Sequence, residues 1–417
     1  MVYIGVDLHR KKSQVAALDQ HGNLVFNRKV RTGPGEMQQL IDELRPQPIQ
    51  VAFEATFGWG WFADLLAELG VPAHMAHPLK TKAVSSARVK NDAVDAKMLA
   101  HLLRVDLLPE GWIAPPAVRE GRRLVRMRAA LVRVRAKLRA QIHALLGEHG
   151  IQPEVVDILS KRGRAMLSEL QLPPITRGRL QACLRLIDEI SLEIVIAERE
   201  IYQGINDDQR LKRLLPIPGI GPIIAATILS EIGDVTRFPT ADKLCAWAGL
   251  TPKEHSSADN VRRGHISKQG SRWLRWVMVE AAVHAFRDVE LRQHFVRIAR
   301  RRGAKVARVA VARRLLTLVY YALRSETGCW SYPISSNPKV EARSLAVRCG
   351  TGRESWPLAH DGCLAAVPER LAVTAHQGQK SPSISGPWNR CRTGMSTLTQ
   401  SRRLYLPTPL AWPCWSC

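Results

Sequence analysis

The first 115 residues alternate between the hydrophobic spacing of strands and that of helices. Short runs rich in Val, Ile and Ala predict strands, and amphipathic stretches with apolar residues three and four apart predict helices. A polar segment at 21–23 predicts a tight turn between two of the strands. The predicted order is strand, strand, strand, helix, strand, helix, strand, helix, at residues 2–9, 13–19, 23–31, 35–45, 49–55, 61–69, 71–78 and 91–105. This order predicts a mixed α/β sheet flanked by helices.

Two longer amphipathic stretches follow. Residues 117–148 read as one helix with an arginine-rich opposite face, and residues 180–201 repeat its apolar spacing after a break at Pro173 and Pro174. The apolar positions of the first helix are Leu124, Met127, Leu131, Val134, Leu138, Ile142 and Leu145. Such helices can pair as a coiled coil, antiparallel within one chain or between two chains. A plain helical spacer is the alternative.

The pattern changes twice more along the chain. Residues 208–326 are helical and interrupted by Gly and Pro, which predicts a separate all-α domain. From residue 327 no period is sustained, and six of the eight cysteines lie there. The terminal pair Cys414 and Cys417 has no second pair at ligand spacing. We therefore expect domains at 1–115, 116–207 and 208–326, and a non-globular tail at 327–417 that is a read-through or frame-shifted extension.

The charge balance indicates a polyanionic partner. The chain has 61 Lys and Arg against 37 Asp and Glu, a net charge of +24, of which residues 1–326 carry +18. Nucleic acid is the expected partner. No apolar run reaches the ~18 residues of a membrane span, and the amino terminus lacks a secretory pattern, so we expect a cytoplasmic protein with no membrane partner.

Four carboxylates lie in or at the ends of the predicted strands and helices. Asp7 lies in the first strand, Glu54 lies at the end of the fourth, and Asp92 and Asp95 lie three apart at the start of a helix that Asn91 can cap. If the two strands are neighbours, the four side chains can converge at one sheet edge. Their mutual repulsion is relieved by two Mg²⁺ ions, or Mn²⁺ in their place, and such a pair supports phosphodiester chemistry. Taken singly, each acid is more often a strand-end or first-turn acid.

The order of these acids resembles the ribonuclease-H-like fold of RuvC-type Holliday-junction resolvases. More closely, YIGVDLH, FEATFGWG, VKNDAVDAKMLA, LLPIPGIGPIIAATILSEIGD and the serine segment below resemble the DEDD transposases of the insertion-sequence-110 family, over residues 3–325. The resemblance implies that Asp7, Glu54, Asp92 and Asp95 bind metal. It also implies DNA at the element ends and target as substrate, a structured guide RNA as a second partner, and a bacterial protein associated with the nucleoid.

A glycine-containing turn opens an apolar helix in the predicted helical domain. Gly219 and Gly221 precede residues 223–233, and free backbone N–H groups at such a turn suit a phosphate oxygen. The turn is similar to a helix-hairpin-helix DNA-binding turn. A dinucleotide fingerprint is excluded because Ile224 stands where the third glycine would be. A purely structural turn is the alternative.

The polar segment after it, GLTPKEHSSADNVRRGHISKQGSRWLR, is expected to be a flexible loop. By the resemblance, Ser257 is the nucleophile that forms a phosphoserine with DNA. The family has glycine after this serine and this chain has Ala258, so the choice between Ser256 and Ser257 stays open. Basic residues that could hold phosphates lie in this segment and in the arginine-rich helices beyond it, and are Arg262, Arg263, Lys268, Arg272, Arg275, Arg300, Arg301 and Arg302.

The sequence therefore predicts an enzyme: a transposase or site-specific recombinase of an insertion element, Mg²⁺-dependent, with a serine nucleophile and RNA guidance, working as a dimer or tetramer. Two alternatives stay open. One is a metal-dependent junction nuclease that uses water. The other is an inactive DNA-binding remnant.

Overall fold

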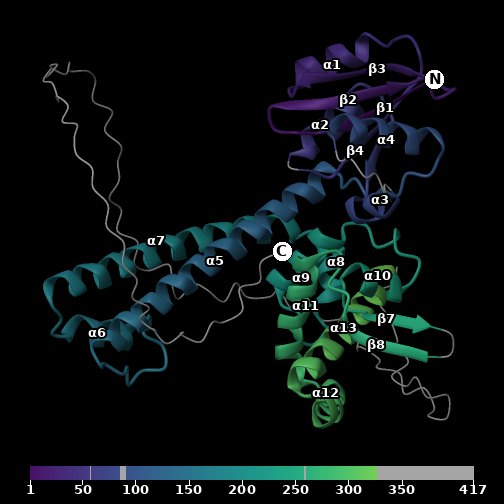
Figure 1. The fold of residues 1–417 in the computed structure, drawn as a ribbon. Helices are drawn as coiled ribbons and strands as arrows, with labels where there is room; N and C mark the ends of the chain where they lie inside the picture. The colour runs from purple at the N-terminus through teal and green to yellow at the C-terminus, as the bar shows by residue number, and fades with distance from the viewer. Residues whose placement is uncertain (57, 85–90, 258–259, 326–417) are drawn as a thin grey trace, which may run out of the picture. The chain divides into compact units, whose positions relative to one another are not determined.

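The computed structural model describes residues 1–325 except 57, 85–90 and 258–259, within one compact unit, Met1–Gly350 (Figure 1). At 82–84, 255–257 and 260–263 only the backbone is described. The tail expected at 327–417 lies outside the described residues.

A six-stranded mixed sheet organises the first part of the chain (Figure 1). Its order is β3-β2-β1-β4-β5-β6. The first three strands form an antiparallel meander, and β1, β4 and β5 run parallel. The five longer strands confirm the predicted ones, whereas β6 was not predicted. The strands are β1 (Val2–Asp7), β2 (Lys12–Leu18), β3 (Leu24–Arg31), β4 (Ile49–Glu54), β5 (Ala73–Ala76) and β6 (Glu110–Gly111).

Helices cover both faces of this sheet, and the alternation along β1 assigns each residue to a face. Val2, Ile4 and Val6 join the core beneath α1 (Pro34–Asp42) and α2 (Trp59–Glu68). Tyr3 packs on the opposite face with residues of α4 (Asp92–Arg104). Asp7 shares the parity of Tyr3 and therefore belongs to the α4 face. A short helix, α3 (Pro78–Val84), precedes α4 and was not predicted.

Gly5 allows α4 to lie directly on β1. A Cβ at this position would meet the Ala96 carbonyl oxygen and lie 2.6 Å from the Ala100 nitrogen. The backbones of strand and helix therefore touch where a side chain would hold them apart. The start of α4 is capped as predicted, because the Asn91 side chain accepts a hydrogen bond from the Ala93 N–H.

The two long helices form an antiparallel pair within the chain. They are α5 (Pro116–Glu148) and α7 (Pro174–Ile205), joined through α6 (Lys161–Glu169), which was not predicted. The antiparallel direction follows from contacts at both ends: Val125 near the start of α5 packs with Ile201 near the end of α7, and Ile142 near the end of α5 shares a core with Leu180 near the start of α7.

The predicted apolar stripe of α5 is only partly buried. Ile142 and Leu145 belong to the core, but Met127 and Val134 are each 47% exposed, and Val125 and Ala129 are buried in place of those two. The partner surface shifts because α9 also packs against α5 in this stretch. The spacing thus predicted the helix correctly and part of its buried face wrongly.

The last part of the described chain is a helical bundle around α13, whose Ala312, Leu315 and Val319 are buried. Its helices are α8 (Gln209–Leu214), α9 (Pro222–Ile232), α10 (Ala241–Trp247), α11 (Arg272–His284), α12 (Val289–Arg302) and α13 (Ala304–Arg324), with a 3-10 turn at Ala285–Arg287.

This bundle is not all-α, and the expectation of a flexible serine loop was wrong. Strands β7 (Pro252–Ser257) and β8 (Asn260–Ile266) form an antiparallel hairpin in that segment. The polar composition hid it, because this segment shows no alternation of apolar and polar residues while the backbone groups of its two strands still pair.

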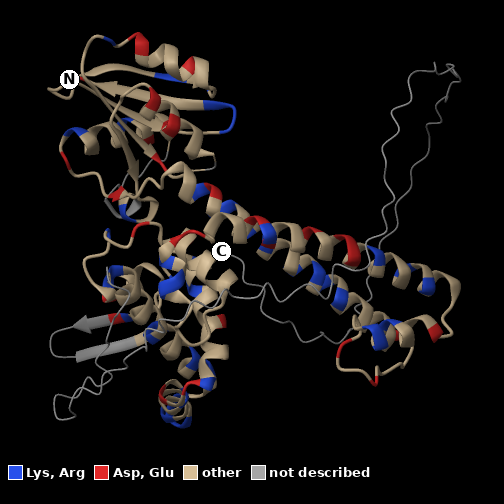
Figure 2. Ribbon diagram, turned by 180° about the vertical axis from the view of Figure 1, so that it is seen from behind, with Lys and Arg blue, Asp and Glu red and all other residues tan. Residues whose placement is uncertain are grey.

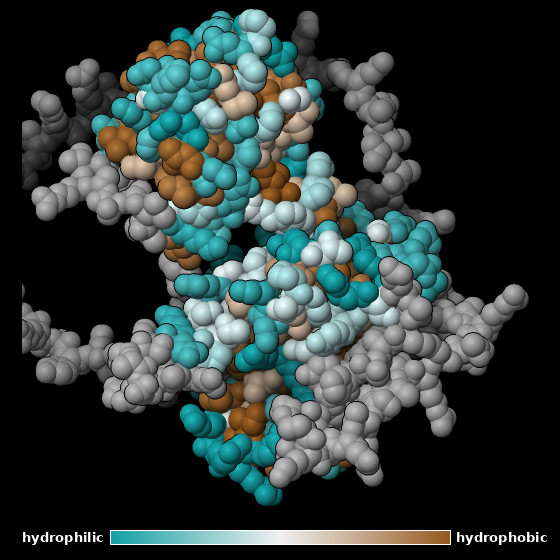
Figure 3. Space-filling view, turned by 90° about the vertical axis from the view of Figure 1, so that its right-hand side faces the viewer, coloured by the Kyte–Doolittle hydropathy of each residue, from teal (hydrophilic) through white to brown (hydrophobic). Residues whose placement is uncertain are grey.

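Polar and apolar side chains are interspersed on the molecular face drawn in Figure 3. Among the described residues no helix combines the length and the hydropathy of a membrane span.

We predict that Gly5→Ala lowers the free energy of unfolding by about 3 kcal/mol, because the added methyl pushes α4 off β1. Calorimetric unfolding of the full chain measures this. Gly35→Ala is the matched control, since nothing lies within 4 Å of a Cβ there and alanine favours helix α1. Equal effects of the two substitutions would contradict the close-packing explanation.

Candidate functional site

Asp7 is a buried carboxylate at the end of β1. Its residue is 7% exposed, and Val6 before it lies in the core. A buried carboxylate requires a hydrogen-bond donor or a cation to balance its charge. The strand therefore presents an acid at a position where the surrounding structure must neutralise it.

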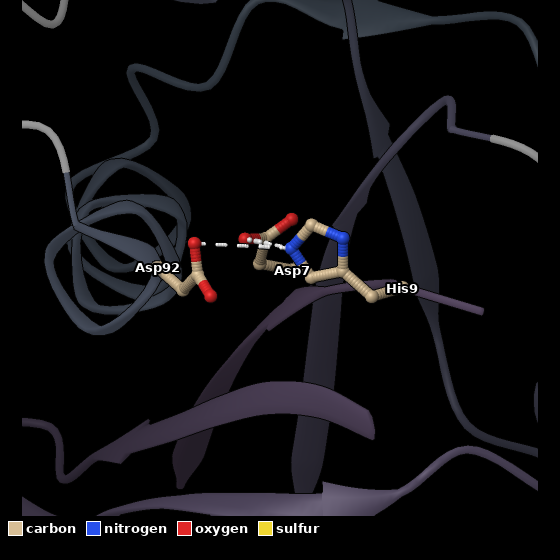
Figure 4. Close-up of side chains that lie close together, drawn as sticks. All are labelled: Asp7, His9 and Asp92. Carbon is tan, nitrogen blue, oxygen red and sulfur yellow. Dashed lines mark hydrogen bonds and ion pairs between the residues drawn. The ribbon is translucent and has the colours of Figure 1, made fainter. Parts of the chain in front are cut away.

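His9 and Asp92 supply the immediate surroundings of Asp7. His9 Nε2 lies 3.0 Å from Asp7 Oδ2 and 3.9 Å from Asp92 Oδ1. Since an ionised carboxylate only accepts, the imidazole N–H donates to Asp7. Figure 4 shows the ring beside the Asp7 carboxylate, with dashed lines from His9 to Asp7 at the end of the strand and to Asp92 in the first turn of α4. The three residues offer ligand atoms that all lie within 4.8 Å of one another.

His9 was missed in the sequence. The signal was the spacing Asp7-x-His9, because residues two apart on an extended chain point to the same side.

Burial raises the pKa of the Asp7 carboxyl, and His9 opposes this by charge and by hydrogen bonding. The carboxylates of Asp92 and Asp95 raise the Asp7 pKa further. The site thus gathers more negative charge than one imidazole compensates.

This donor set fits a divalent cation. Two carboxylates and an imidazole suit the hard to borderline ions Mg²⁺ and Mn²⁺, with water filling the remaining positions. The side chains of His9 and Asp92 are each 50% exposed, so an ion can enter from solvent.

Glu54 and Asp95 lie at neighbouring positions of the same sheet edge. β1 and β4 are adjacent and parallel with Val6 beside Phe53, so Glu54 ends the strand next to Asp7. Asp95 is in the first turn of α4 and acts on Asp7 electrostatically. Neither acid belongs to the group of three within 4.8 Å, so convergence of all four on two ions stays a prediction.

The predicted nucleophiles are both on β7. Ser257 ends the strand opposite Asn260, and Ser256 precedes it. On β8, Arg262 and Arg263 pair in register with residues 255 and 254. Ala258, on which the choice of serine depended, lies outside the described residues.

The glycine turn has a clear packing role at its first glycine. Gly219 has φ +83°, and a Cβ there would meet the Ala281 carbonyl oxygen of α11. Gly221 is different, because it is the N-cap of α9 and has nothing within 4 Å of a Cβ. The open side of the turn lines a pocket of about 470 Å³ that also includes His284 and Arg287.

The other predicted phosphate contacts differ in availability. Arg275 donates to the Ala248 carbonyl oxygen, and burial lowers its pKa, so it braces the fold. Lys268 lies at a backbone position with a positive φ of 54°, and it already interacts with another group of the chain. The exposed residues are Arg272 at the start of α11 and Arg300, Arg301 and Arg302 in the last turn of α12.

Glu231 is a second buried acid that the sequence reasoning missed. It is 1% exposed on α9 and accepts hydrogen bonds from Arg126 Nε of α5 and from Ser271 Oγ, each at 2.9 Å. Ser271 in turn caps α11. The signal was an acid inside the apolar run IIAATILSEIG. The Glu231 carboxylate ties three helices together just after the serine hairpin.

Two family models match this chain, one in its N-terminal half and one in the helical bundle that carries the serine hairpin. The model described as "Transposase IS116/IS110/IS902 family" matches residues 211–297, and the DEDD model for IS110, described as "Transposase", matches residues 4–151. A probable family 20 transposase of Pseudomonas aeruginosa is 30% identical over 341 residues, 78% of this chain and 97% of that protein.

Two further relatives are transposases of named elements. The transposase of IS1328 from Yersinia enterocolitica is 28% identical, covering 67% of this chain and 82% of its own. The transposase of IS1111A from Coxiella burnetii is 23% identical, covering 78% and 90%.

We predict that Asp7→Asn abolishes most of the thermal stabilisation that Mn²⁺ gives the wild-type chain, because a neutral amide is a poor ligand. Saturating ion at about 100 times Kd stabilises a protein by about 2.7 kcal/mol. Metal-free Asp7→Asn should be no less stable than wild type, since the buried charge is gone. Glu68→Gln, at an exposed acid on α2, serves as the control. An unchanged Mn²⁺ effect in Asp7→Asn would contradict metal binding here.

Proposed function

This chain belongs to the IS110 family of DEDD transposases, and we propose that it breaks and rejoins DNA at the ends of an insertion element, using a serine nucleophile and a divalent metal centre. The family implies a DNA transposase enzyme and dependence on a divalent metal. The observation that carries the proposal is the meeting of His9 and Asp92 with the buried carboxylate of Asp7 at the end of β1.

We assign Asp7, Glu54, Asp92 and Asp95 to the metal centre, with Mg²⁺ as the ion. A divalent ion held there would polarise a phosphodiester oxygen and neutralise the charge that develops on it. His9 Nε2 lies 3.0 Å from Asp7 Oδ2 and 3.9 Å from Asp92 Oδ1, so its imidazole lies against both carboxylates. The residue we add to the predicted set is therefore His9, which orients Asp7.

The proposed covalent step uses Ser257. Its Oγ attacks phosphorus at the scissile phosphodiester and loses its proton to a base, while the 3′ oxygen leaves and takes up a proton. The 5′ end then stays attached to the protein as a phosphoserine. In the second step, a 3′ hydroxyl of the recipient strand attacks the phosphoserine, releases Ser257 and restores a DNA phosphodiester.

We propose the domain boundaries 1–115, 116–207 and 208–326, with a ribonuclease-H-like first domain and a helix-hairpin-helix-like turn at Gly219 and Gly221. The sheet order and the parallel pairing of β1 with β4 support the first domain. The open N-cap of α9 supports phosphate contact at Gly221, and the packing of Gly219 supports a structural role for that residue.

We also propose that the transposase works as a dimer or tetramer through the α5 and α7 pair. Exposed apolar residues on this pair support an assembly surface. They are Met127, Val134, Leu192, Val195 and Ile196, each at least 40% exposed. A guide RNA remains part of the proposal. A net charge of +24 supports it, because such a charge attracts polyanions such as RNA.

Figure 2 shows Lys and Arg along the long helix pair and on the C-terminal helices. Several of those on α5 are already paired within the chain, such as Arg119 with Asp64, Arg128 with Glu198 and Arg139 with Asp157. The arginines at the end of α12 have no carboxylate partner among the described ion pairs, so they are better placed to hold DNA.

We predict that Ser257→Ala abolishes covalent protein–DNA adducts at element-end DNA with Mg²⁺, because no other oxygen replaces Oγ. The adducts are measured as protein-linked 5′ ends on denaturing gels. Ser256→Ala is the matched neighbour and should keep adduct formation. The reverse pattern moves the nucleophile to Ser256, and cleavage by the double variant would favour a water-using junction nuclease instead.

We predict that replacing Arg300, Arg301 and Arg302 with serine lowers the magnitude of the salt slope of DNA binding by about 2 to 3, since each phosphate contact contributes ~0.9. The slope is log affinity against log salt from fluorescence anisotropy. Replacing exposed Lys161 and Arg162 of α6 provides the control. An equal decrease of the salt slope in both variants would mean that α12 does not contact the DNA phosphates more than α6 does.

A further inference from the structure

A cluster of arginines and tryptophans lies where α11 packs near α5. The guanidinium carbons of Arg126 and Arg133 on α5 lie 5.6 and 5.1 Å from the centre of the Trp273 ring, and that of Arg272 lies 5.7 Å from it. Trp276 meets Trp273 edge to face, with ring centres 6.0 Å apart. We call these five residues the tryptophan cluster.

The cluster carries unbalanced positive charge. Arg126 is neutralised by Glu231 at 2.7 Å, but Arg133 and Arg272 have no carboxylate partner among the described ion pairs. Both are exposed. Two guanidinium groups beside one ring repel each other, so the arrangement gains stability from an anion that binds between or beside them.

Trp276 gives the cluster an aromatic surface open to solvent. Trp276 is 43% exposed, and it is the one exposed tryptophan among the described residues. An isolated exposed apolar residue needs no explanation, but an exposed indole beside unpaired arginines combines the two elements that bind unpaired nucleotides: a ring for the base and cations for the phosphates.

The geometry points to a single-stranded DNA site at the tryptophan cluster: we propose that one base of an unpaired DNA strand stacks on Trp276 while Arg133 and Arg272 bind its flanking phosphates. Double-stranded DNA fits poorly, because its bases are already stacked on each other. RNA is the competing source of unpaired bases. DNA is favoured because cutting and strand exchange unpair the DNA itself.

The position of the cluster along the chain agrees with this occupant. Trp273 and Trp276 lie in the first two turns of α11, which begins six residues after the end of the serine hairpin β7–β8. A strand released at that hairpin would have a binding surface on the helix that follows. This inference rests on the proposed function, since it takes the unpaired strand to arise from cleavage.

The test compares binding of full-length wild type and Trp276→Ala to labelled dT20, U20 and a 20-base-pair duplex at one salt concentration. Removal of one stacked base should weaken dT20 binding by about tenfold, with duplex binding changed less than twofold. Trp276→Phe keeps an aromatic face and should retain dT20 affinity within about threefold. Tyr202→Ala, at a 44% exposed aromatic residue on α7, should bind all three probes as wild type does.

Several outcomes would overturn the inference. They are unchanged dT20 binding, an equal loss on dT20 and duplex, a loss confined to U20, or a change of oligomeric state in sedimentation that accompanies the loss. Thermal unfolding of each variant shows whether it folds, and Arg133→Gln provides an independent variant whose dT20 affinity should also fall.

Cleavage of element-end duplex by wild type, with Mg²⁺ and the candidate guide RNA of the element present, is measured in parallel. If wild type does not cleave but Trp276→Ala still loses dT20 binding, the proposed function fails and the strand site stands. If cleavage is intact and dT20 binding is unaffected, the strand site alone fails.

Discussion

The direct contact between strand β1 and helix α4 is the constraint on which the candidate metal site depends. Gly5 has no side chain to separate them, so the helix backbone at Ala96 rests on the strand. That contact brings the first turn of α4, with Asp92, to the end of β1, with Asp7. Two acids 85 positions apart in sequence therefore share one small volume, and their repulsion makes a cation favourable there.

Arginine has two separate uses in this chain. On α5 it largely holds the fold together: Arg122 donates to carbonyl oxygens at the end of α9, and Arg126 satisfies the buried Glu231 carboxylate. Arg237 lies over the rings of Trp112 and Trp247, and burial lowers its pKa to about 10. The positive charge left for nucleic acid is therefore smaller than the net charge suggests, and it includes Arg133 of α5, Arg272 of α11 and the three arginines in the last turn of α12.

Buried polar contacts hold in place the segment that directly follows the serine hairpin. Ser271 both caps α11 and donates to Glu231, and the chain before it passes so close to Trp247 that only Gly270, with φ +79°, fits. The nucleophile that we propose on this hairpin would need such an anchor at its base, because catalysis depends on positions held to within a fraction of an ångström.

Local patterns determined much of this protein without tertiary information. Short runs rich in Val, Ile and Ala were enough to predict the five longer strands, and apolar residues three and four apart were enough for α1, α2, α4, α5 and α7. The order of Asp7 and Glu54 predicted a shared sheet edge only if their strands are neighbours, and the adjacent, parallel β1 and β4 meet that condition. These features depend on neighbours a few residues away or on simple sheet rules.

Only the tertiary structure decided which side chains meet. The contact of His9 with Asp92, and the position of Glu231 between Arg126 and Ser271, each depend on groups brought together from distant segments. Their sequence signals are single polar residues, which mean little until folding removes them from water. A buried charge must then find its partner, and the sequence alone does not say which partner lies within reach.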